Sequence, residues 1–206
     1  MPSLIHEREL QALGHARVAG VDEAGRGAWA GPVVAAAVIL PNSKSAIAKL
    51  RRLGVHDSKQ LSAMARAACR ALIDAHAISC GIGQASCREI DALGIVPATR
   101  LAMLRAVAAL LPQPTALIID AVHLSDCPIH QRVFNFADSI SLSVAAASII
   151  AKTTRDALMG AMDTTVPGYG FARHKGYGTA VHQNALRSLG ASSEHRRTYA
   201  PIRMLL

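Results

Sequence analysis

Two runs rich in valine and alanine, residues 17–23 and 33–40, constrain the fold of this chain more than any other feature. Small and β-branched apolar side chains favour an extended chain in this context because they pack well on a pleated surface. The stretch AGRGAWAGP between the runs contains three glycines, which permit a turn. The sequence therefore predicts two strands joined by a connection, and hence a sheet around which the other segments are arranged.

The remaining segments alternate between short apolar runs and longer amphipathic stretches. Short apolar runs between turn signals favour buried strands, whereas apolar residues spaced three and four apart favour helices. Ser86 and Glu89 have the spacing of a capping box, which predicts a short helix after Ser86. We expect further strands over residues 78–85, 116–120 and 133–136, and helices over residues 62–76, 97–111, 141–162 and 179–189.

This order of elements predicts an α/β fold with a mixed β-sheet flanked by helices and a small C-terminal helical extension. The length of 206 residues suits one compact domain with a sizeable apolar core. We expect residues 1–160 to form the main domain and residues 161–206 to form the helical extension, packed on the same domain. A hydrophobic content of 51% excludes a disordered chain.

The chain is strongly basic, with a formal net charge of +8 at pH 7. This balance favours a polyanionic partner such as nucleic acid or an anionic lipid surface, but a generically basic soluble protein accounts for it equally well. The four cysteines lack the paired short spacing of zinc sites and are expected to be reduced thiols. The sequence has no signal peptide and no apolar run of membrane-spanning length, so we expect a soluble cytoplasmic protein without a membrane partner.

Acidic residues close or follow several of the predicted strands. Ligands gather at strand ends in α/β sheets. Carboxylates brought together repel one another unless a cation lies among them, and Mg²⁺ or Mn²⁺ prefers such oxygen ligands. Any one of these acids, taken alone, is better explained as an ordinary turn or ion-pair residue. As a group they predict a divalent-metal site formed by Asp22, Glu23, Asp120 and Asp138.

Asp22 and Glu23 are adjacent, and adjacent residues of a strand point to opposite faces of the sheet. Both side chains can reach one ion only if the strand does not simply continue past them. Gly25 and Gly27 follow at once, and they indicate that the strand ends or bends there.

The run VAGVDEAGRGAWAGPVVAAAVIL, residues 18–40, closely resembles the opening motif of ribonuclease HII, the type 2 ribonuclease H family. Similar blocks follow in the family's order, so the resemblance covers nearly the whole chain. DEAGRG, AAASIIAK and HKGYGT together are far more specific than any single short motif. The later blocks are HDSKQLS (56–62), GIGQASCREID (81–91), ADSISLSVAAASIIAKTTRD (137–156), GYGFARHKGYGTAVH (168–182) and HRRTYAP (195–201).

The resemblance implies a ribonuclease H-like fold and a catalytic, metal-binding set of four carboxylates at Asp22, Glu23, Asp120 and Asp138. It also implies residues that contact the substrate. The glycine-containing motif would sense the 2′-hydroxyl of the ribonucleotide, a tyrosine would pack against the sugar next to the scissile phosphate, and basic residues would contact phosphates. These substrate-binding positions are Gly25, Arg26, Gly27, Lys59, Lys152, Arg155 and Tyr177.

The activity implied is endonucleolytic hydrolysis of RNA in RNA·DNA hybrids, including ribonucleotides embedded in duplex DNA. Two Mg²⁺ or Mn²⁺ ions would act during catalysis, and the products would carry 5′-phosphate and 3′-hydroxyl ends. We expect a monomer whose partner is the hybrid or the ribonucleotide-containing duplex. His174 and His182 are left outside the catalytic set, because a histidine near basic residues is more often a phosphate contact or a structural group.

Some positions depart from the family pattern or admit a second interpretation. The family usually has glycine after the third acid and often lysine two residues after the fourth, but this chain has Ala121 and Ile140 there. Val122 and Ser139 belong to the same two departures, which affect local loop geometry or a substrate contact more than the metal ligands. Arg155 is equally well explained as a solvated helix charge.

Three other classes of protein were considered. A non-catalytic nucleic-acid-binding module would explain the basic charge, and metal-dependent cleavage distinguishes it from a nuclease. A nucleotide-binding enzyme is excluded because HKGYGT lacks the end of a P-loop and GIGQAS lacks the third glycine of a dinucleotide fingerprint. A serine or cysteine hydrolase is poorly supported because no Gly-x-Ser-x-Gly motif is present.

Overall fold

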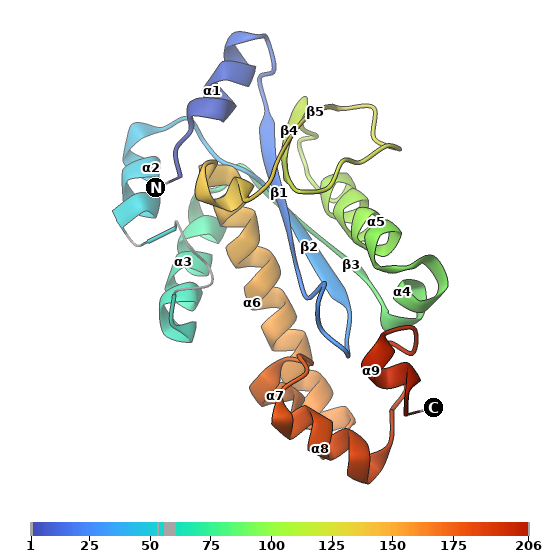
Figure 1. Ribbon diagram of the computed structural model, residues 1–206. Helices are drawn as coiled ribbons and strands as arrows, with labels where there is room; N and C mark the ends of the chain where they lie inside the picture. Colours follow the sequence, from blue (N-terminus) through green and yellow to red (C-terminus); the bar gives the residue numbers. More distant parts are fainter. Residues whose placement is uncertain (1, 53, 56–60, 206) are drawn as a thin grey trace.

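In the computed structural model, which describes residues 2–52, 54–55 and 61–205, five strands form one mixed sheet (Figure 1). The strand order is β3-β2-β1-β4-β5. The pairs β1–β2 and β2–β3 are antiparallel, and the pairs β1–β4 and β4–β5 are parallel. The strands are β1 (Val18–Ala24), β2 (Val33–Ile39), β3 (Ser79–Ala85), β4 (Ala116–Asp120) and β5 (His130–Phe134). The predicted mixed sheet is confirmed.

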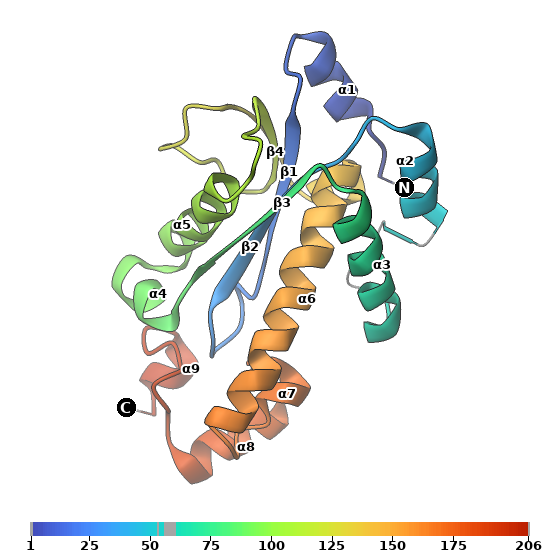
Figure 2. The same cartoon turned by 180° about the vertical axis from the view of Figure 1, so that it is seen from behind.

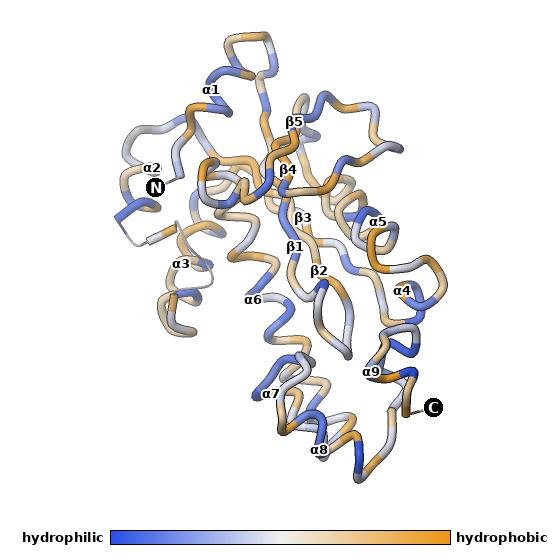
Figure 3. The backbone as a smooth tube through the Cα atoms, in the orientation of Figure 1, coloured by the Kyte–Doolittle hydropathy of each residue, from blue (hydrophilic) through white to orange (hydrophobic). Residues whose placement is uncertain are grey.

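Every residue of β2 is buried. Its sequence VVAAAVI is apolar on both faces, as a central strand covered by helices on both sides requires. The tube coloured by hydropathy shows the same feature, and hydrophilic colouring interrupts β1 where its acidic residues lie (Figure 3).

The long helix α6 (Leu142–Thr165) covers one face of the sheet, together with α3 (Ala63–His76) and α2 (Lys44–Arg52) (Figure 1). The Ala-rich first half of α6 packs closely because Gly20 in β1 has no side chain. A Cβ at Gly20 would overlap the backbone of Ser143 and Val144. The helix predicted over residues 141–162 is confirmed, and it packs against the sheet.

The opposite face is covered by α5 (Ile95–Ala108) and α4 (Cys87–Leu93), which Figure 2 shows from behind. Here β3 supplies the close approach, since a Cβ at Gly81 or Gly83 would meet the backbone of α5. The predicted capping box starts α4: Ser86 accepts a hydrogen bond from the Glu89 amide, and the Glu89 carboxylate accepts from the Ser86 amide at 2.8 Å.

Four helices were not anticipated from the sequence. They are α1 (Ile5–Ala12), α2, the short α7 (Phe171–His174) and α9 (Ala200–Arg203). The predicted last long helix is α8 (Ala180–Leu189), and Thr179 caps it by accepting a hydrogen bond from the His182 amide at 3.3 Å. The short helices α7 and α9 escaped notice because one turn of helix leaves no periodic pattern.

The region after α6 packs around a small apolar cluster of its own, which includes Ala30, Met159, Phe171, Leu186 and Ile202. Ala30 belongs to the connection between β1 and β2, so this cluster joins the C-terminal helices to the sheet. The predicted boundary at residue 160 falls within α6, and the division into residues 1–160 and 161–206 stays a prediction.

Among the described residues, no helix is long and apolar enough to cross a membrane. Cys69, Cys80, Cys87 and Cys127 are free thiols, as the sequence predicted.

Candidate active site

The parallel pairing of β1 and β4 brings two of the predicted acids together. The last paired residues are Val21 and Ile119, and Asp22 and Asp120 are the next residue of each strand. Because parallel strands run in the same direction, their carboxyl ends lie at one edge of the sheet. Asp22 and Asp120 therefore lie at adjacent positions of neighbouring strands. In the chain they are 98 residues apart (120 minus 22).

Asp22 is buried, with 5% of its surface exposed. Burial raises the pKa of Asp22 well above its usual range, and the negative charges of Glu23 and Asp120 raise it further, while a hydrogen bond with Ser148 opposes the shift. One Asp22 carboxylate oxygen also accepts a hydrogen bond from the Glu23 amide at 2.7 Å. The protein thus holds this carboxylate firmly in a place where its charge is unfavourable.

Glu23 is the residue after Asp22 within β1, which continues to Ala24. Burial raises the pKa of Glu23, the Arg26 guanidinium lowers it, and the charge of Asp120 raises it. The Arg26 Nη1 to Glu23 Oε1 distance is 3.2 Å. Asp22 and Glu23 both lie near the charge of Asp120, and β1 ends at Ala24, directly before Gly25, as the glycines indicated.

Asp120 is tied to the segment that carries the fourth acid. Its Oδ1 accepts a hydrogen bond from the Ala137 amide at 2.8 Å, and Asp138 is the next residue. Asp138 lies in a short 3-10 helix, η1 (Ala137–Ser139), and not directly after a strand as predicted. The strand β5 ends at Phe134 because Phe136 adopts a left-handed backbone, with φ 59°, that no strand continues.

Ala121 replaces the glycine that the family usually has after the third acid, and it explains that preference. Its φ is +55°, in the left-handed region that glycine adopts without strain. A side chain in this conformation costs roughly 1–2 kcal/mol. The turn after β4 is formed despite the substitution, with the Ala121 amide donating to Phe134 O at 2.9 Å.

We tested whether these carboxylates suit a metal ion. Within the part of the chain that the structure describes, no three His, Cys, Asp or Glu side chains are already arranged to hold one. The chemistry of the set nevertheless fits a hard divalent cation, because the buried Asp22 and the half-buried Glu23 are oxygen donors whose pKa values are raised partly by the charge of Asp120. A cation among them would offset that repulsion.

The loop after β1 differs between its two motif glycines. Gly25 has φ +96°, and a Cβ there would overlap the Arg155 side chain. Gly27 has nothing within 4 Å of the position of a Cβ, so its surroundings are open. Gly25 is thus required by the packing of the protein itself. Among the described residues, nothing requires a glycine at position 27.

Arg196, which the sequence did not indicate as a site residue, anchors this loop through hydrogen bonds to its backbone. Its guanidinium donates hydrogen bonds to Gly25 O at 2.7 Å, to Arg26 O at 2.8 Å and to Gly31 O at 2.9 Å. The Tyr199 hydroxyl also donates to Arg26 O, at 2.6 Å. A peptide unit points its C=O and N–H in opposite directions, so fixing these carbonyls also fixes the direction of the amides that follow them.

Arg155 has a structural role in place of the phosphate contact that the resemblance implied. It is 1% exposed, and its guanidinium donates to Pro32 O at 2.9 Å, to Lys175 O at 2.9 Å and to Ala30 O at 3.2 Å. Burial lowers the pKa of Arg155 to about 10. With its donors turned to buried carbonyls, Arg155 is also not the solvated helix charge of the alternative interpretation. Its guanidinium carbon lies 5.5 Å from the ring centroid of Tyr177.

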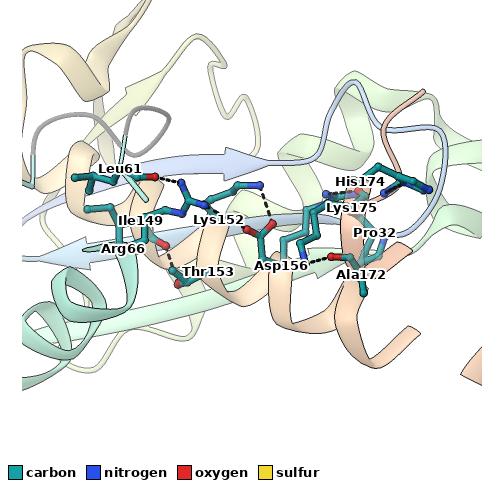
Figure 4. Close-up of polar contacts among 12 residues, drawn as sticks. Pro32, Leu61, Arg66, Ile149, Lys152, Thr153, Asp156, Ala172, His174 and Lys175 are labelled. Atoms are coloured by element: carbon teal, nitrogen blue, oxygen red, sulfur yellow. Dashed lines mark hydrogen bonds and ion pairs between the residues drawn. The ribbon is translucent and has the colours of Figure 1, made fainter. Parts of the chain in front are cut away.

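A cleft of about 470 Å³ lies beside the acids on the α6 side. Arg66 of α3 and Lys152 of α6 reach toward Asp156, as Figure 4 shows. The Lys152 Nζ to Asp156 Oδ1 distance is 2.7 Å, so the i,i+4 pair that the sequence allowed is present. The cleft is lined by Glu23, Ala24, Gly25, Arg66, Ser148, Lys152 and Tyr177.

Several predicted site residues therefore share one cleft, and others do not. Tyr177 is 40% exposed and lies in the cleft with Gly25 and Lys152. Arg155 lies behind it, and Lys59 lies outside the described residues. Ser148 and Arg66 were missed because single polar residues on a helix carry no spacing signal.

His174 and His182 are buried behind the loop and stack on each other, with ring centroids 4.5 Å apart. The His182 Nδ1 lies 3.0 Å from Tyr177 O, and its Nε2 lies 3.0 Å from the Nε2 of His195. These contacts fix the backbone that carries Tyr177. Leaving both histidines out of the catalytic set is consistent with this position.

Comparison with known proteins agrees with this geometry. The family model described as ribonuclease HII matches residues 19–201. A ribonuclease HII of Chloroflexus aurantiacus is 53% identical over 202 residues, which cover 98% of this chain and 95% of the relative. A ribonuclease HII of Geobacillus kaustophilus is 51% identical over 98% of this chain and 75% of its own length.

Solved structures give the same fold. The ribonuclease H2 of Pyrococcus horikoshii superposes with a TM-score of 0.75 at 25% identity, over 92% of this chain and 96% of the other. A structure of Bst-RNase HIII in complex with Mn²⁺ gives a TM-score of 0.71 at 25% identity, over 91% of this chain and 68% of the other.

The fold and the relatives define a metal-dependent nuclease of the ribonuclease H class. Within that class, the chain belongs to the ribonuclease HII family. Members of this family hydrolyse the RNA strand of RNA·DNA hybrids and ribonucleotides embedded in duplex DNA, which is the activity that the resemblance implied.

Proposed function

We propose that Asp22, Glu23, Asp120 and Asp138 are the catalytic carboxylates and hold the metal ions. The observation that carries this proposal is the parallel register of β1 and β4, which places Asp22 and Asp120 at adjacent positions with Glu23 next in the chain. A protein whose net charge is +8 has no evident structural use for buried acids whose charges repel one another. Metal binding gives them a use.

The proposed ions are Mg²⁺ or Mn²⁺, two of them during catalysis. When bound, they would supply an activated water and would stabilise the leaving 3′-oxygen. The residues of the chain prepare the site for this chemistry. Ser148 and the Glu23 amide orient the Asp22 carboxylate, and the Ala137 amide orients Asp120. Asp138, one residue after that amide, completes the set.

Recognition of the ribonucleotide is proposed to use the Gly25–Arg26–Gly27 turn together with Tyr177. The Ala28 amide donates to Gly25 O at 3.3 Å and closes this turn. Among the described residues, no acceptor takes a hydrogen bond from the Arg26 or Gly27 amide, so both remain for a ligand. A 2′-hydroxyl that enters the open space beside Gly27 would meet these donors, and deoxyribose would not offer that acceptor.

Lys152 is proposed to contact a phosphate of the substrate. It lines the cleft and is partly exposed, and a phosphate can compete with Asp156 for its ammonium group. The assignment of Lys59 to a second phosphate contact stays a prediction.

The protein is proposed to act as a cytoplasmic monomer on the RNA·DNA hybrid or the ribonucleotide-containing duplex. Four free thiols suit a reducing compartment. The cleft, the acids and the loop are all supplied by one copy of the chain, so the proposed site needs no second subunit.

The function is tested with a DNA duplex that contains a single ribonucleotide, incubated with the purified protein and Mg²⁺, Mn²⁺ or EDTA. We expect cleavage only with metal, one cut at the ribonucleotide, and 5′-phosphate and 3′-hydroxyl ends when the fragments are mapped. The same duplex made entirely of DNA should stay intact. Metal-independent cleavage, or binding without any cleavage, would contradict the proposed site and favour a non-catalytic binding module.

A further inference from the structure

Phe136 is an exposed aromatic residue beside the acids. It is 72% exposed. The chain has seven Phe, Tyr and Trp residues, all within the described part, and Tyr177 is the other one that is exposed. An aromatic side chain that stays in water gains nothing from the hydrophobic effect within the protein. Its position therefore needs an explanation other than core packing.

The backbone places Phe136 next to the acidic cluster. The Ala137 amide that follows it donates to Asp120 Oδ1 at 2.8 Å, and Asp138 lies two residues after it. In the sheet, Phe136 follows β5, whereas Tyr177 lies in the cleft beside the end of β1. In the order of the strands, β4 with Asp120 therefore lies between the segments that carry the two exposed aromatic residues.

The backbone of Phe136 is strained. Its φ is 59° and its ψ is 41°, a left-handed conformation that glycine or asparagine adopts more easily than phenylalanine. The turn is held by Ser139, whose amide and hydroxyl both donate to Phe136 O, at 3.0 and 2.7 Å. Exposure and backbone conformation thus both disfavour phenylalanine at this position. Such local conflicts concentrate at functional sites.

We propose that the Phe136 ring packs against the sugar of a nucleotide in the bound duplex, on the side of the acids opposite Tyr177. This inference rests on the proposed function. A sugar is the expected contact because the bases of a duplex are stacked on one another and phosphates are strongly hydrated anions. The apolar face of the sugar is then the surface that an exposed ring can cover. The two aromatic residues then hold the duplex on either side of the acids and contribute to binding rather than to the chemical step.

The test compares Phe136→Asn and Phe136→Trp with the unmodified protein. Asparagine suits the left-handed backbone but has no ring, whereas tryptophan keeps a ring. We expect Phe136→Asn to weaken binding of the single-ribonucleotide duplex roughly 5- to 30-fold in EDTA, and to raise KM similarly with Mn²⁺. Its kcat at saturating duplex and its urea unfolding midpoint should not fall. Phe136→Trp should bind within about twofold of the unmodified protein.

Leu13→Asn is the matched control, since Leu13 is 67% exposed at the end of α1 and lies before the start of β1. It should leave Kd and KM unchanged. If the unmodified protein cleaves the duplex and Phe136→Asn binds it equally well, the sugar contact is wrong while the proposed function stands. If Phe136→Trp binds as weakly as Phe136→Asn, the ring is not what the duplex contacts. A protein that never cleaves the duplex would refute the proposed function and this inference with it.

Discussion

Two neighbouring regions of the molecule contain buried charges: the acids of β1 and β4, and the loop that follows β1. The groups that surround those charges differ between the two regions. Asp22 and Glu23 are buried near Asp120, whose negative charge raises both pKa values. The buried charges around the loop are the guanidinium groups of Arg155, from α6, and Arg196, from the segment after α8. Each donates hydrogen bonds to backbone carbonyls. The guanidinium groups meet neutral carbonyl oxygens, whereas the acids accept hydrogen bonds and also lie near one another's negative charge.

This difference indicates which part of the site is formed before ligands bind. Fixed carbonyls hold the turn around Gly27 in one conformation, so the proposed ribose-recognition site costs little ordering when the substrate arrives. The acids keep their repulsion until a cation is present. Under the proposed function, the protein carries a preformed ribose-recognition loop next to acids that act only when metal is bound.

The largest effect on catalysis is expected from a substitution among the acids. Asp22→Asn removes a charge but keeps the size of the side chain, so cation binding weakens while the fold remains. We expect kcat to fall on the order of 10²- to 10³-fold, as when one group that stabilises a transition-state charge is removed. Duplex binding should change little. Single-turnover cleavage and anisotropy titration measure the two quantities.

Asp74→Asn is the matched control, because Asp74 lies on α3 in an exposed pair with Arg70, at 2.8 Å. It should keep activity within about twofold. Activity of Asp22→Asn equal to that of Asp74→Asn would remove Asp22 from the metal site.

Intermediate effects on stability and substrate discrimination are expected from substitutions of Gly25 and Gly27 in the loop after β1. Gly25→Ala places a Cβ against Arg155 at a positive φ and should lower the free energy of unfolding by about 1–3 kcal/mol. Gly27→Ala meets open space and should change stability by less than about 0.5 kcal/mol. Its discrimination between ribonucleotide and all-DNA duplexes should nevertheless fall, because the methyl group occupies the proposed ribose position.

Urea denaturation and cleavage assays on both variants check this contrast. Equal loss of stability in the two variants would show that a side chain at position 27 meets other atoms of the protein. Unchanged discrimination in Gly27→Ala would show that the ribose does not approach there.

The smallest effect is expected from the segment that anchors the loop. Burial lowers the pKa of His195 to about 4, and the neighbouring His182 and His174 charges lower it as well, against a hydrogen bond with Ser192. The unfolded chain then binds more protons than the folded protein between about pH 6.5 and about pH 4, so the free energy of unfolding falls as the pH falls through this window. One such proton accounts for at most about 1.4 kcal/mol per pH unit.

His195→Gln should make the acid-side slope of stability shallower, measured as urea midpoints at several pH values. His182 contributes in the same direction, because burial also lowers its pKa. The exposed His123 provides the control His123→Gln, which should leave the slope as it is. An identical slope in both variants would mean that His195 is not buried as a neutral group.

Local signals were enough to predict much of the fold. Ser86 and Glu89 form their capping box, and Thr179 caps its helix, because a cap depends on residues only three positions apart. The buried runs became strands for a similar reason, since alternation and β-branched content are local properties. The helices α7 and α9 are one turn long and have no such signal.

The acids show the limit of the same reasoning. The positions of Asp22 and Asp120 near strand ends were predicted, as was the end of β1 before Gly25, but Asp138 lies in a 3-10 helix. The left-handed backbones at Ala121 and Phe136 decide where those segments turn. Neither residue type predicts that conformation, so only tertiary contacts could impose it.

The sequence by itself determined which segments are strands and helices, and it indicated the acids and glycines of the proposed site, because hydrophobic spacing, caps and family motifs are written along the chain. The tertiary structure decided what the basic residues do. Arg155 looked like a phosphate contact and Arg196 like nothing in particular, yet both donate to carbonyls of the loop after β1. A guanidinium binds carbonyl and phosphate oxygens alike, so only burial among folded neighbours could distinguish the two roles.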